Sequence, residues 1–176
     1  MADPTRFLDT FPTWLKSLGT DAAALADLVR EGALPEAPQR SVIGSLHYLI
    51  KSLDLIPDGI EDIGFLDDAF VLRVAARQAL AASGRHEVIE RLGGEAAIVS
   101  DFLGADTARL ETYVQGLTKG TARGRSVDDI LGDEAARAAL VSEIGSWVAS
   151  YSAPTFTRDE RTLVKLRSFL DTKLPR

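Results

Sequence analysis

The chain has 176 residues, of which 45% are hydrophobic and 26% charged, and its net charge at neutral pH is -6. This composition excludes an intrinsically disordered chain, and the acidic balance offers no basic face for phosphate groups, so no nucleic-acid partner is expected. Because the chain has no cysteine, disulfides and thiolate metal sites are excluded as well, which suits a reducing compartment. We expect a cytoplasmic protein with one domain over residues 1–176.

Neither a signal peptide nor a membrane-spanning helix is expected. The N-terminal residues lack a basic stretch followed by an uninterrupted apolar run. Lys51, Asp54 and Asp58 interrupt the most apolar region, where a membrane-spanning helix needs about 20 mostly apolar residues. Export and membrane insertion are therefore both disfavoured.

Apolar residues recur at three- and four-residue steps along the chain, which predicts an all-α fold without strands, a bundle of about seven to nine helices. In the first part, the pattern predicts helices over residues 7–18, 21–31 and 41–53. Gly19 and Gly32 are interpreted as helix stops. Gly44 falls inside the third helix, where glycine costs about 1 kcal/mol relative to alanine, so a close crossing of another segment is expected there.

Residues 65–82 are apolar on almost every side and are predicted to form the central helix. At helical spacing Asp67 groups with Arg73 and Arg77, whereas Asp68 groups with apolar residues and is expected to face protein. Beyond it, the pattern predicts helices over residues 86–92, 95–103, 106–117 and 133–151, a basic solvated loop over 119–125, and a last helix within 157–174. The C-terminal helices, 86–174, either complete the same core or form a lobe.

Thr157 and Glu160 have the spacing of a capping box for the last helix. The same type of pair occurs earlier, where Asp58 and Glu61 are predicted to cap a short helical turn that follows Pro57. The turn at Pro57 is thus predicted to lie at the centre of a hairpin, between one helix and the next.

Six carboxylates lie among leucine, isoleucine and phenylalanine between residues 46 and 72. Capping accounts for Asp58, and the positive end of the central helix favours an acid at Asp67. Asp54 and Asp68 need another partner, because a buried carboxylate requires hydrogen bonds or a cation. The candidates are the backbone amides of the proline turn or the side chains of Lys51, Arg73, Arg77 and Arg40.

A second interpretation is that Asp54, Asp58, Asp67 and Asp68 converge on Mg²⁺ or Ca²⁺, which prefer oxygen ligands. The spacing matches neither an EF-hand nor an H-E-x-x-H motif. We interpret His47 as a packing residue with satisfied hydrogen bonds, and His86 lies at a helix start on the surface. No nucleophile has a credible base and acid, so no catalytic residue is assigned and an enzyme is not the leading hypothesis.

Three consecutive stretches resemble the signature of the YkvA-like family, a small bacterial domain of unknown function: Tyr48-Leu49-Ile50, Asp54-Leu55-Ile56-Pro57-Asp58 and Ile63-Gly64-Phe65-Leu66-Asp67-Asp68. The resemblance covers about residues 42–80. It implies a helix, a turn that contains proline, and a second helix, with no established activity. The sequence departs from the family pattern at Lys51-Ser52, Gly59 and Glu61-Asp62, and the added charges make it less hydrophobic than many relatives.

The leading hypothesis for function is a non-catalytic interaction or regulatory module. Its unknown protein partner would bind near the acidic turn or the helix over residues 7–18. The alternative is a divalent-metal-binding protein or metal-dependent enzyme that uses the four aspartates. A weaker alternative, which the resemblance implies, is peripheral membrane association. The oligomeric state is open.

Overall fold

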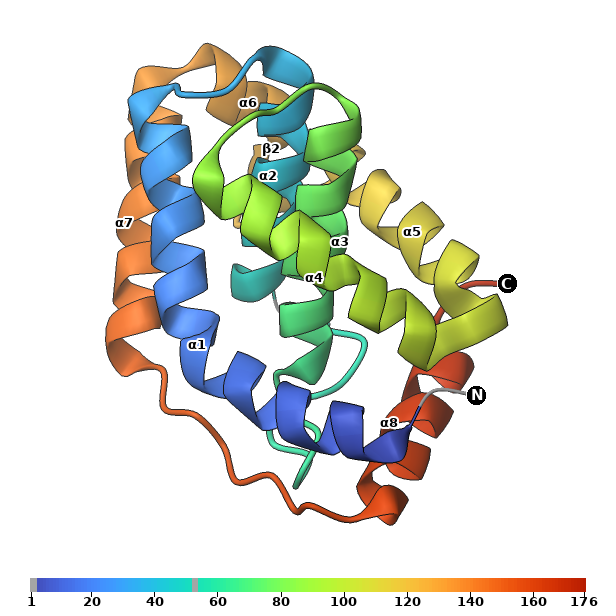
Figure 1. Ribbon diagram of the computed structural model, residues 1–176. Helices are drawn as coiled ribbons and strands as arrows, with labels where there is room; N and C mark the ends of the chain where they lie inside the picture. Colours follow the sequence, from blue (N-terminus) through green and yellow to red (C-terminus); the bar gives the residue numbers. More distant parts are fainter. Residues whose placement is uncertain (1–2, 52–53) are drawn as a thin grey trace.

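In a computed structural model, which describes residues 3–51 and 54–176, the chain folds into a bundle of α-helices (Figure 1). The helices are α1 (Pro4–Glu31), α2 (Glu36–Ile50), α3 (Leu66–Ala81), α4 (Glu87–Leu103), α5 (Thr107–Gly116), α6 (Val127–Gly132), α7 (Glu134–Ser150) and α8 (Glu160–Lys173). Two 3-10 turns, η1 (Gly104–Asp106) and η2 (Leu117–Lys119), and two short strands, β1 (Thr121–Ala122) and β2 (Arg125–Ser126), complete the described elements. The prediction of an all-α bundle is confirmed.

Helix α3 lies at the centre of the bundle and packs against α1, α2, α4 and α5 (Figure 1). Its side chains are buried almost all round, as the nearly uniform apolar sequence predicts. The buried apolar residues form one continuous cluster that extends from Phe7 on α1 to Leu174 after α8. Among the described helices, none combines the length and the apolar character needed to cross a membrane.

The first two predicted helices, 7–18 and 21–31, are one continuous helix, α1, so the prediction of a stop at Gly19 is wrong. Gly19 lies buried within α1, and a Cβ atom there would lie 3.5 Å from the ring of Tyr151 at the end of α7. This is an ordinary packing distance, so Gly19 lies where α1 meets the end of α7 although the packing does not require a glycine there. Pro12 also lies inside α1, which is visibly bent in Figure 1, and proline removes one donor of the helical ladder.

Predicted helices 86–92 and 95–103 are likewise one helix, α4, and the predicted break at Gly93 and Gly94 is wrong. A Cβ atom on Gly93 would lie 2.5 Å from a methyl group of Leu80 on α3. Gly93 thus allows α4 to lie against α3. The expected close crossing at Gly44 is confirmed, because a Cβ there would lie 3.1 Å from the backbone carbon of Leu117 in η2.

Three local predictions need correction. The basic loop 119–125 contains the antiparallel pair β1–β2, so the fold is not free of strands. Helix α8 is capped by Asp159, whose carboxylate accepts from the amide of Arg161, and not by Thr157. Helix α2 begins at Glu36 and not at Ser41, while its expected end at Leu53 lies outside the described residues.

Residues 151–159 form an extended strap that leads from α7 to α8 along the end of the bundle where the loop before α3 lies (Figure 1). The hydroxyl of Tyr151 donates to the carbonyl of Leu15 at 2.6 Å. Further along, the amide and the hydroxyl of Thr157 both donate to Oδ1 of Asp62, at 3.1 and 2.6 Å. The strap therefore fastens the loop before α3 to the C-terminal part of the chain.

Arg73 lies in the interior of the bundle, where it joins α3 to α1 and α4. Its guanidinium lies 3.3 Å from Asp21 and 3.3 Å from Glu95, and 4.0 Å from the ring centre of Trp14. Asp21 is only 1% exposed and also binds Arg91 at 2.7 Å. Arg73 is therefore buried together with the charges that neutralise it.

Candidate metal centre

Residues 54–65 connect α2 to α3 through a series of tight turns. The amide of Ile60 donates to the carbonyl of Pro57 at 3.0 Å, and the amide of Gly64 donates to the carbonyl of Ile60 at 2.9 Å. A Cβ atom on Gly64 would collide with the carbonyl oxygen of Asp58, so only glycine fits there. Because these residues form turns and no helix, the predicted cap of a helical turn by Asp58 and Glu61 is wrong.

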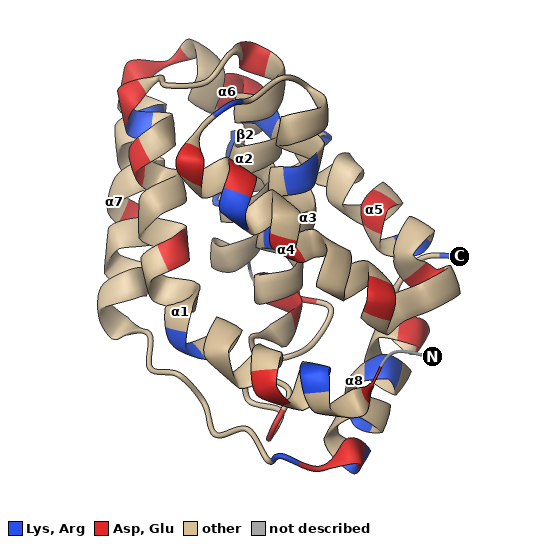
Figure 2. Cartoon of the chain, in the orientation of Figure 1, with Lys and Arg blue, Asp and Glu red and all other residues tan. Residues whose placement is uncertain are grey.

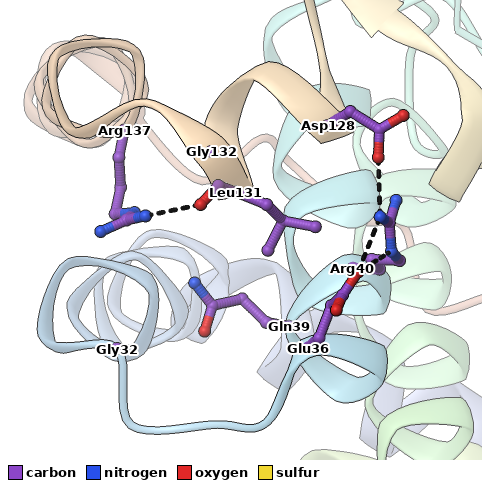
Figure 3. A pocket seen from close by; sticks show the side chains of 8 residues that line it. All are labelled: Gly32, Glu36, Gln39, Arg40, Asp128, Leu131, Gly132 and Arg137. Carbon is purple, nitrogen blue, oxygen red and sulfur yellow. Dashed lines mark hydrogen bonds and ion pairs between the residues drawn. The ribbon is translucent and has the colours of Figure 1, made fainter.

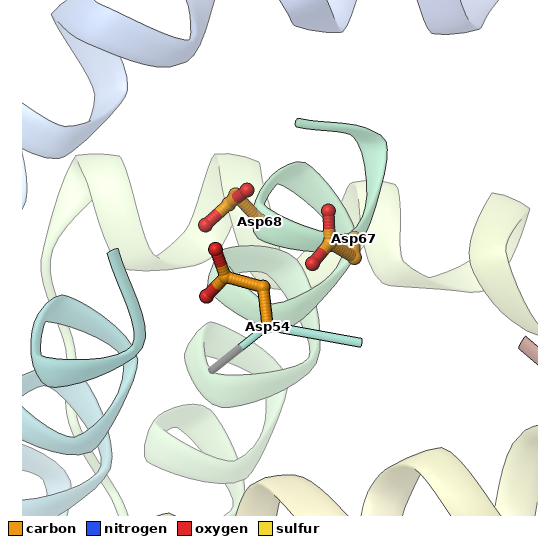
Figure 4. Close-up of side chains that lie close together, drawn as sticks. All are labelled: Asp54, Asp67 and Asp68. Carbon is orange, nitrogen blue, oxygen red and sulfur yellow. The ribbon is translucent and has the colours of Figure 1, made fainter. Parts of the chain in front are cut away.

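Three aspartates converge where this loop meets the first turn of α3. Asp67 and Asp68 begin α3, and Asp54 faces them from the start of the loop (Figure 4). One carboxylate oxygen from each lies within 4.8 Å of the others. Asp67 and Asp68 are 0% and 2% exposed, and Asp54 is half-buried. The fourth predicted residue, Asp58, is exposed and does not belong to this group.

Tyr48 on α2 holds Asp67 in place. Its hydroxyl lies 2.5 Å from Oδ2 of Asp67, to which it donates, and accepts from the amide of Leu55 at 2.7 Å. The amide of Ile56 donates to the same carboxylate oxygen at 3.2 Å. Although Asp67 groups with Arg73 and Arg77 at helical spacing, neither arginine forms an ion pair with it, and Asp67 is buried against the loop.

Each of the three converging aspartates has one buried oxygen with no hydrogen-bond partner among the described residues: Oδ1 of Asp54, Oδ1 of Asp67 and Oδ2 of Asp68. Burial, with the charges of Asp67 and Asp58, raises the pKa of Asp54 to about 7. Burial also raises the pKa of Asp67 to about 6, although the hydroxyl of Tyr48 opposes this. The pKa of Asp68 is raised well above its usual value by burial and by Asp67 and Asp54. The three carboxylates therefore destabilise each other when ionised.

The arginines predicted as partners for these acids bind other carboxylates: Arg73 binds Asp21 and Glu95, Arg77 binds Glu111, and Arg40 binds Glu36 and Asp128. Lys51 is near enough for its charge to lower the pKa of Asp54. No carboxylate of the described chain lies within ion-pair distance of its Nζ atom, however. No cationic side chain of the described chain therefore forms an ion pair with the aspartate cluster, and the raised pKa values mean that protons occupy part of it near neutral pH.

The two histidines do not extend the cluster. His47 is buried as predicted, but neither ring nitrogen has a hydrogen-bond partner in the described chain, so the prediction of a satisfied histidine is wrong. Burial and the charge of Arg125 lower the pKa of His47 to about 4. His86 begins α4, where its Nδ1 accepts from the amide of Val88 at 3.3 Å.

Chemically, the cluster formed by Asp54, Asp67 and Asp68 is an oxygen-only donor set. Two oxygens on opposite sides of Ca²⁺ are about 4.6–5.2 Å apart, and about 4.0–4.2 Å on opposite sides of Mg²⁺. The observed upper limit of 4.8 Å lies within the range for Ca²⁺, whereas Mg²⁺ would require any pair of oxygens more than 4.2 Å apart to move closer. Water would complete the coordination of either one, because three carboxylates supply fewer oxygens than these ions require.

A protein-family model described as a protein of unknown function (DUF1232) matches residues 41–73. The matched part contains most of α2, the turns and the first half of α3, so it includes all three converging aspartates and Tyr48. The predicted resemblance to a family of unknown function is confirmed for this segment. Neither the curated proteins nor the solved structures include a match to the chain.

Proposed function

We propose that this protein is a non-catalytic helical module that binds a divalent cation through Asp54, Asp67 and Asp68. The observation that carries the proposal is the convergence of three carboxylates, each with a buried oxygen that has no partner. We also infer that the segment over residues 41–73 belongs with the YkvA-like proteins, whose signature it resembles.

Electrostatics favours an occupied site. Burying ionised carboxylates is unfavourable unless an opposite charge accompanies them. Near neutral pH, either protons or a cation must compensate Asp67 and Asp68, because the nearby arginines are paired elsewhere. A divalent cation supplies two positive charges at the centre of the cluster, which a single lysine at its edge cannot do.

The donor set favours hard cations, Mg²⁺, Ca²⁺ or Mn²⁺, because all three donors are carboxylates. Asp58 is exposed on the same loop and its charge acts on Asp54, which suits a ligand that reaches the cation through water. A cation held there would connect the loop to the first turn of α3.

A structural or regulatory role fits this position better than catalysis. The cluster is lined by Tyr48 and backbone amides, and Tyr48 is already committed to Asp67 and Leu55. The apolar residues of the helix over 7–18, earlier considered as a partner surface, are buried against the core. The exposed turn around Asp58 and Gly59 is therefore the surface that we propose for a protein partner.

Thermal unfolding tests the cation site. A ligand present at 100 times its dissociation constant stabilises the native state by about 2.7 kcal/mol, which in a chain of this length raises the melting temperature by about 5–10 °C. We expect such a rise with Ca²⁺, Mg²⁺ or Mn²⁺ after treatment with EDTA.

The matched variants are Asp68→Asn, which keeps the shape but removes the charge, and Asp27→Asn, which alters an exposed aspartate paired with Arg30. The rise in melting temperature on adding the cation should disappear in Asp68→Asn and persist in Asp27→Asn. A melting temperature that all three cations leave unchanged at about 10 mM, in a folded protein, would overturn the proposal.

A further inference from the structure

A cavity of about 630 Å³ lies beside α5, at the side of the bundle where the chain ends (Figure 1). Its walls come from the end of α2, from α5 and η2, and from the last two residues of the chain. This volume lies within the range of small-molecule sites, about 300–1,000 Å³. None of the three aspartates lines it, although Lys51 and Tyr113 on its wall lie near enough to the cluster for the charges to act on each other.

Most of the lining is small or apolar: Ala108, Gly116, Leu117, Gly120 and Pro175. Thr112 and Tyr113 add two hydroxyl groups. Gly116 contributes open space, because a Cβ atom at that position would meet no atom within 4 Å. Such a lining suits the apolar body of a small molecule.

The charged residues on the wall are all basic: Lys51, Arg109 and Arg176. Arg109 is already engaged, because it binds Asp106 at 3.0 Å and Asp171 at 2.7 Å. Lys51 differs, since its Nζ has no ion-pair partner in the described chain: it contacts the hydroxyl of Tyr113 at 3.5 Å and the faces of two tyrosine rings, and its charge also acts on Asp54 from beyond ion-pair distance. Half-buried and without a carboxylate partner among the described residues, Lys51 offers a positive charge to a ligand.

A second cavity, of about 490 Å³ between α2 and α6, provides a comparison (Figure 3). Its arginines are committed, because Arg40 binds Glu36 and Asp128 and Arg137 donates to the carbonyl of Leu131 at 2.9 Å. The lining there also includes carboxylates, so it has no preference for an anion. Of these two cavities, the one beside α5 combines an apolar lining with a lysine that has no ion-pair partner in the described chain.

We propose that the cavity beside α5 binds a small organic anion, a molecule with an apolar body and one carboxylate or phosphate group. The Lys51 ammonium pairs with the anionic group, which also accepts from the hydroxyl of Tyr113. The apolar body lies over Leu117 and Pro175, next to the space left by Gly116. Arg176 at the rim contributes less than Lys51, because its side chain is 82% exposed and lies 3.8 Å from the carboxylate of Asp171.

Calorimetric titration with sodium octanoate tests this site, and octyl phosphate distinguishes the two anionic groups. The titrations are made in EDTA, so that their outcome is independent of the cation site. We expect octanoate or octyl phosphate to bind, and octanol and inorganic phosphate to bind at least tenfold more weakly, because each lacks one half of the recognised chemistry. The proposal would be overturned if octanol bound as tightly as both anions. It would also be overturned if neither octanoate nor octyl phosphate bound at millimolar concentration.

Three variants locate the site. Lys51→Met keeps the apolar stem and loses the charge, so it should weaken binding at least tenfold, whereas Lys16→Met, on the exposed side of α1, should leave it within twofold. Gly116→Leu should fill the cavity and abolish binding while the melting temperature stays within a few degrees. Unchanged affinity in both Lys51→Met and Gly116→Leu would contradict the assignment.

Discussion

The hydroxyl of Tyr48 lies 2.5 Å from Oδ2 of Asp67, and the same hydroxyl accepts the amide of Leu55. One side chain on α2 thus connects the loop before α3 with the first turn of α3. The connection explains how a carboxylate that is 0% exposed is held in place.

Replacing Tyr48 by phenylalanine removes the donor to Asp67 and leaves the buried amide of Leu55 without its acceptor. We expect a loss of about 1–3 kcal/mol in the free energy of unfolding, the usual cost of leaving buried polar groups unsatisfied. Urea unfolding measures it. Tyr113→Phe is the control, because its hydroxyl has only a 3.5 Å contact with Lys51, and it should change the stability by less than about 0.5 kcal/mol.

The metal-free protein should lose stability as the pH rises from 6.5 to 8. The pKa of Asp54 is raised to about 7 and that of Asp68 is raised well above its usual value, so the folded state holds protons that the unfolded state has released. The stabilisation from these protons is complete below the pKa of an unfolded aspartate and is lost as the pH passes the folded values. We therefore expect the free energy of unfolding to fall over this range.

His47 has the opposite dependence, because its lowered pKa, about 4, destabilises the folded state as the pH falls through about 6.5. Between pH 6.5 and 8 its contribution is small and makes the protein more stable as the pH rises, so His47 cannot produce the expected loss. Urea unfolding in EDTA at both pH values makes the measurement, and Asp68→Asn should reduce the difference. A stability that rises with pH over this range in EDTA would contradict the raised pKa values.

Gly64→Ala should destabilise the protein by about 2 kcal/mol or more, because the added Cβ collides with the carbonyl of Asp58 and the turn must open. Gly59 in the same loop is the matched control, since a Cβ there would meet no atom within 4 Å. Gly59→Ala should change the stability by less than about 0.5 kcal/mol. Equal effects of the two substitutions on urea unfolding would mean that the turn is looser than described.

Asp21→Asn removes the negative charge that both Arg73 and Arg91 contact, and Arg73 is 0% exposed. Breaking a buried ion pair from one side costs about 3–5 kcal/mol, because the remaining charge stays desolvated. Thermal and urea unfolding should both show this loss. The exposed substitution Asp27→Asn should stay near the wild type, and a similar result for Asp21→Asn would show that Glu95 alone neutralises Arg73.

The sequence is sufficient to predict the helical class, because apolar residues at three- and four-residue steps specify a buried face whichever partner covers it. It is not sufficient at Gly19 and Gly93. A glycine that ends a helix and a glycine at which a neighbouring helix approaches look alike in the sequence, and only the packing partner distinguishes them. For this reason the sequence predicts α1 as two helices, and likewise α4.

The carboxylate-rich segment indicates where the aspartates are, and the structure brings three of the four predicted residues together. Asp58 lies on the exposed side of the loop, near enough for its charge to act on Asp54 but outside the group of three converging oxygens, an arrangement that spacing does not reveal. Tyr48 is missed since it lies 19 residues from Asp67, although a tyrosine preceding buried acids is a usable signal for a donor. The partners of Arg73 are missed for the same reason, because Asp21 lies 52 residues away.

The strap over residues 151–159 has a consequence for the order in which the chain is assembled. Thr157 contacts Asp62 across 95 residues of sequence, and Lys165 donates to the carbonyl of Glu61 across 104. During synthesis, α2, the turns and α3 leave the ribosome long before these two residues. The aspartates can therefore meet early, whereas the loop that bears Asp54 gains its contacts with Thr157 and Lys165 only after those residues have been synthesised. During that interval a cation would have its freest access to the loop.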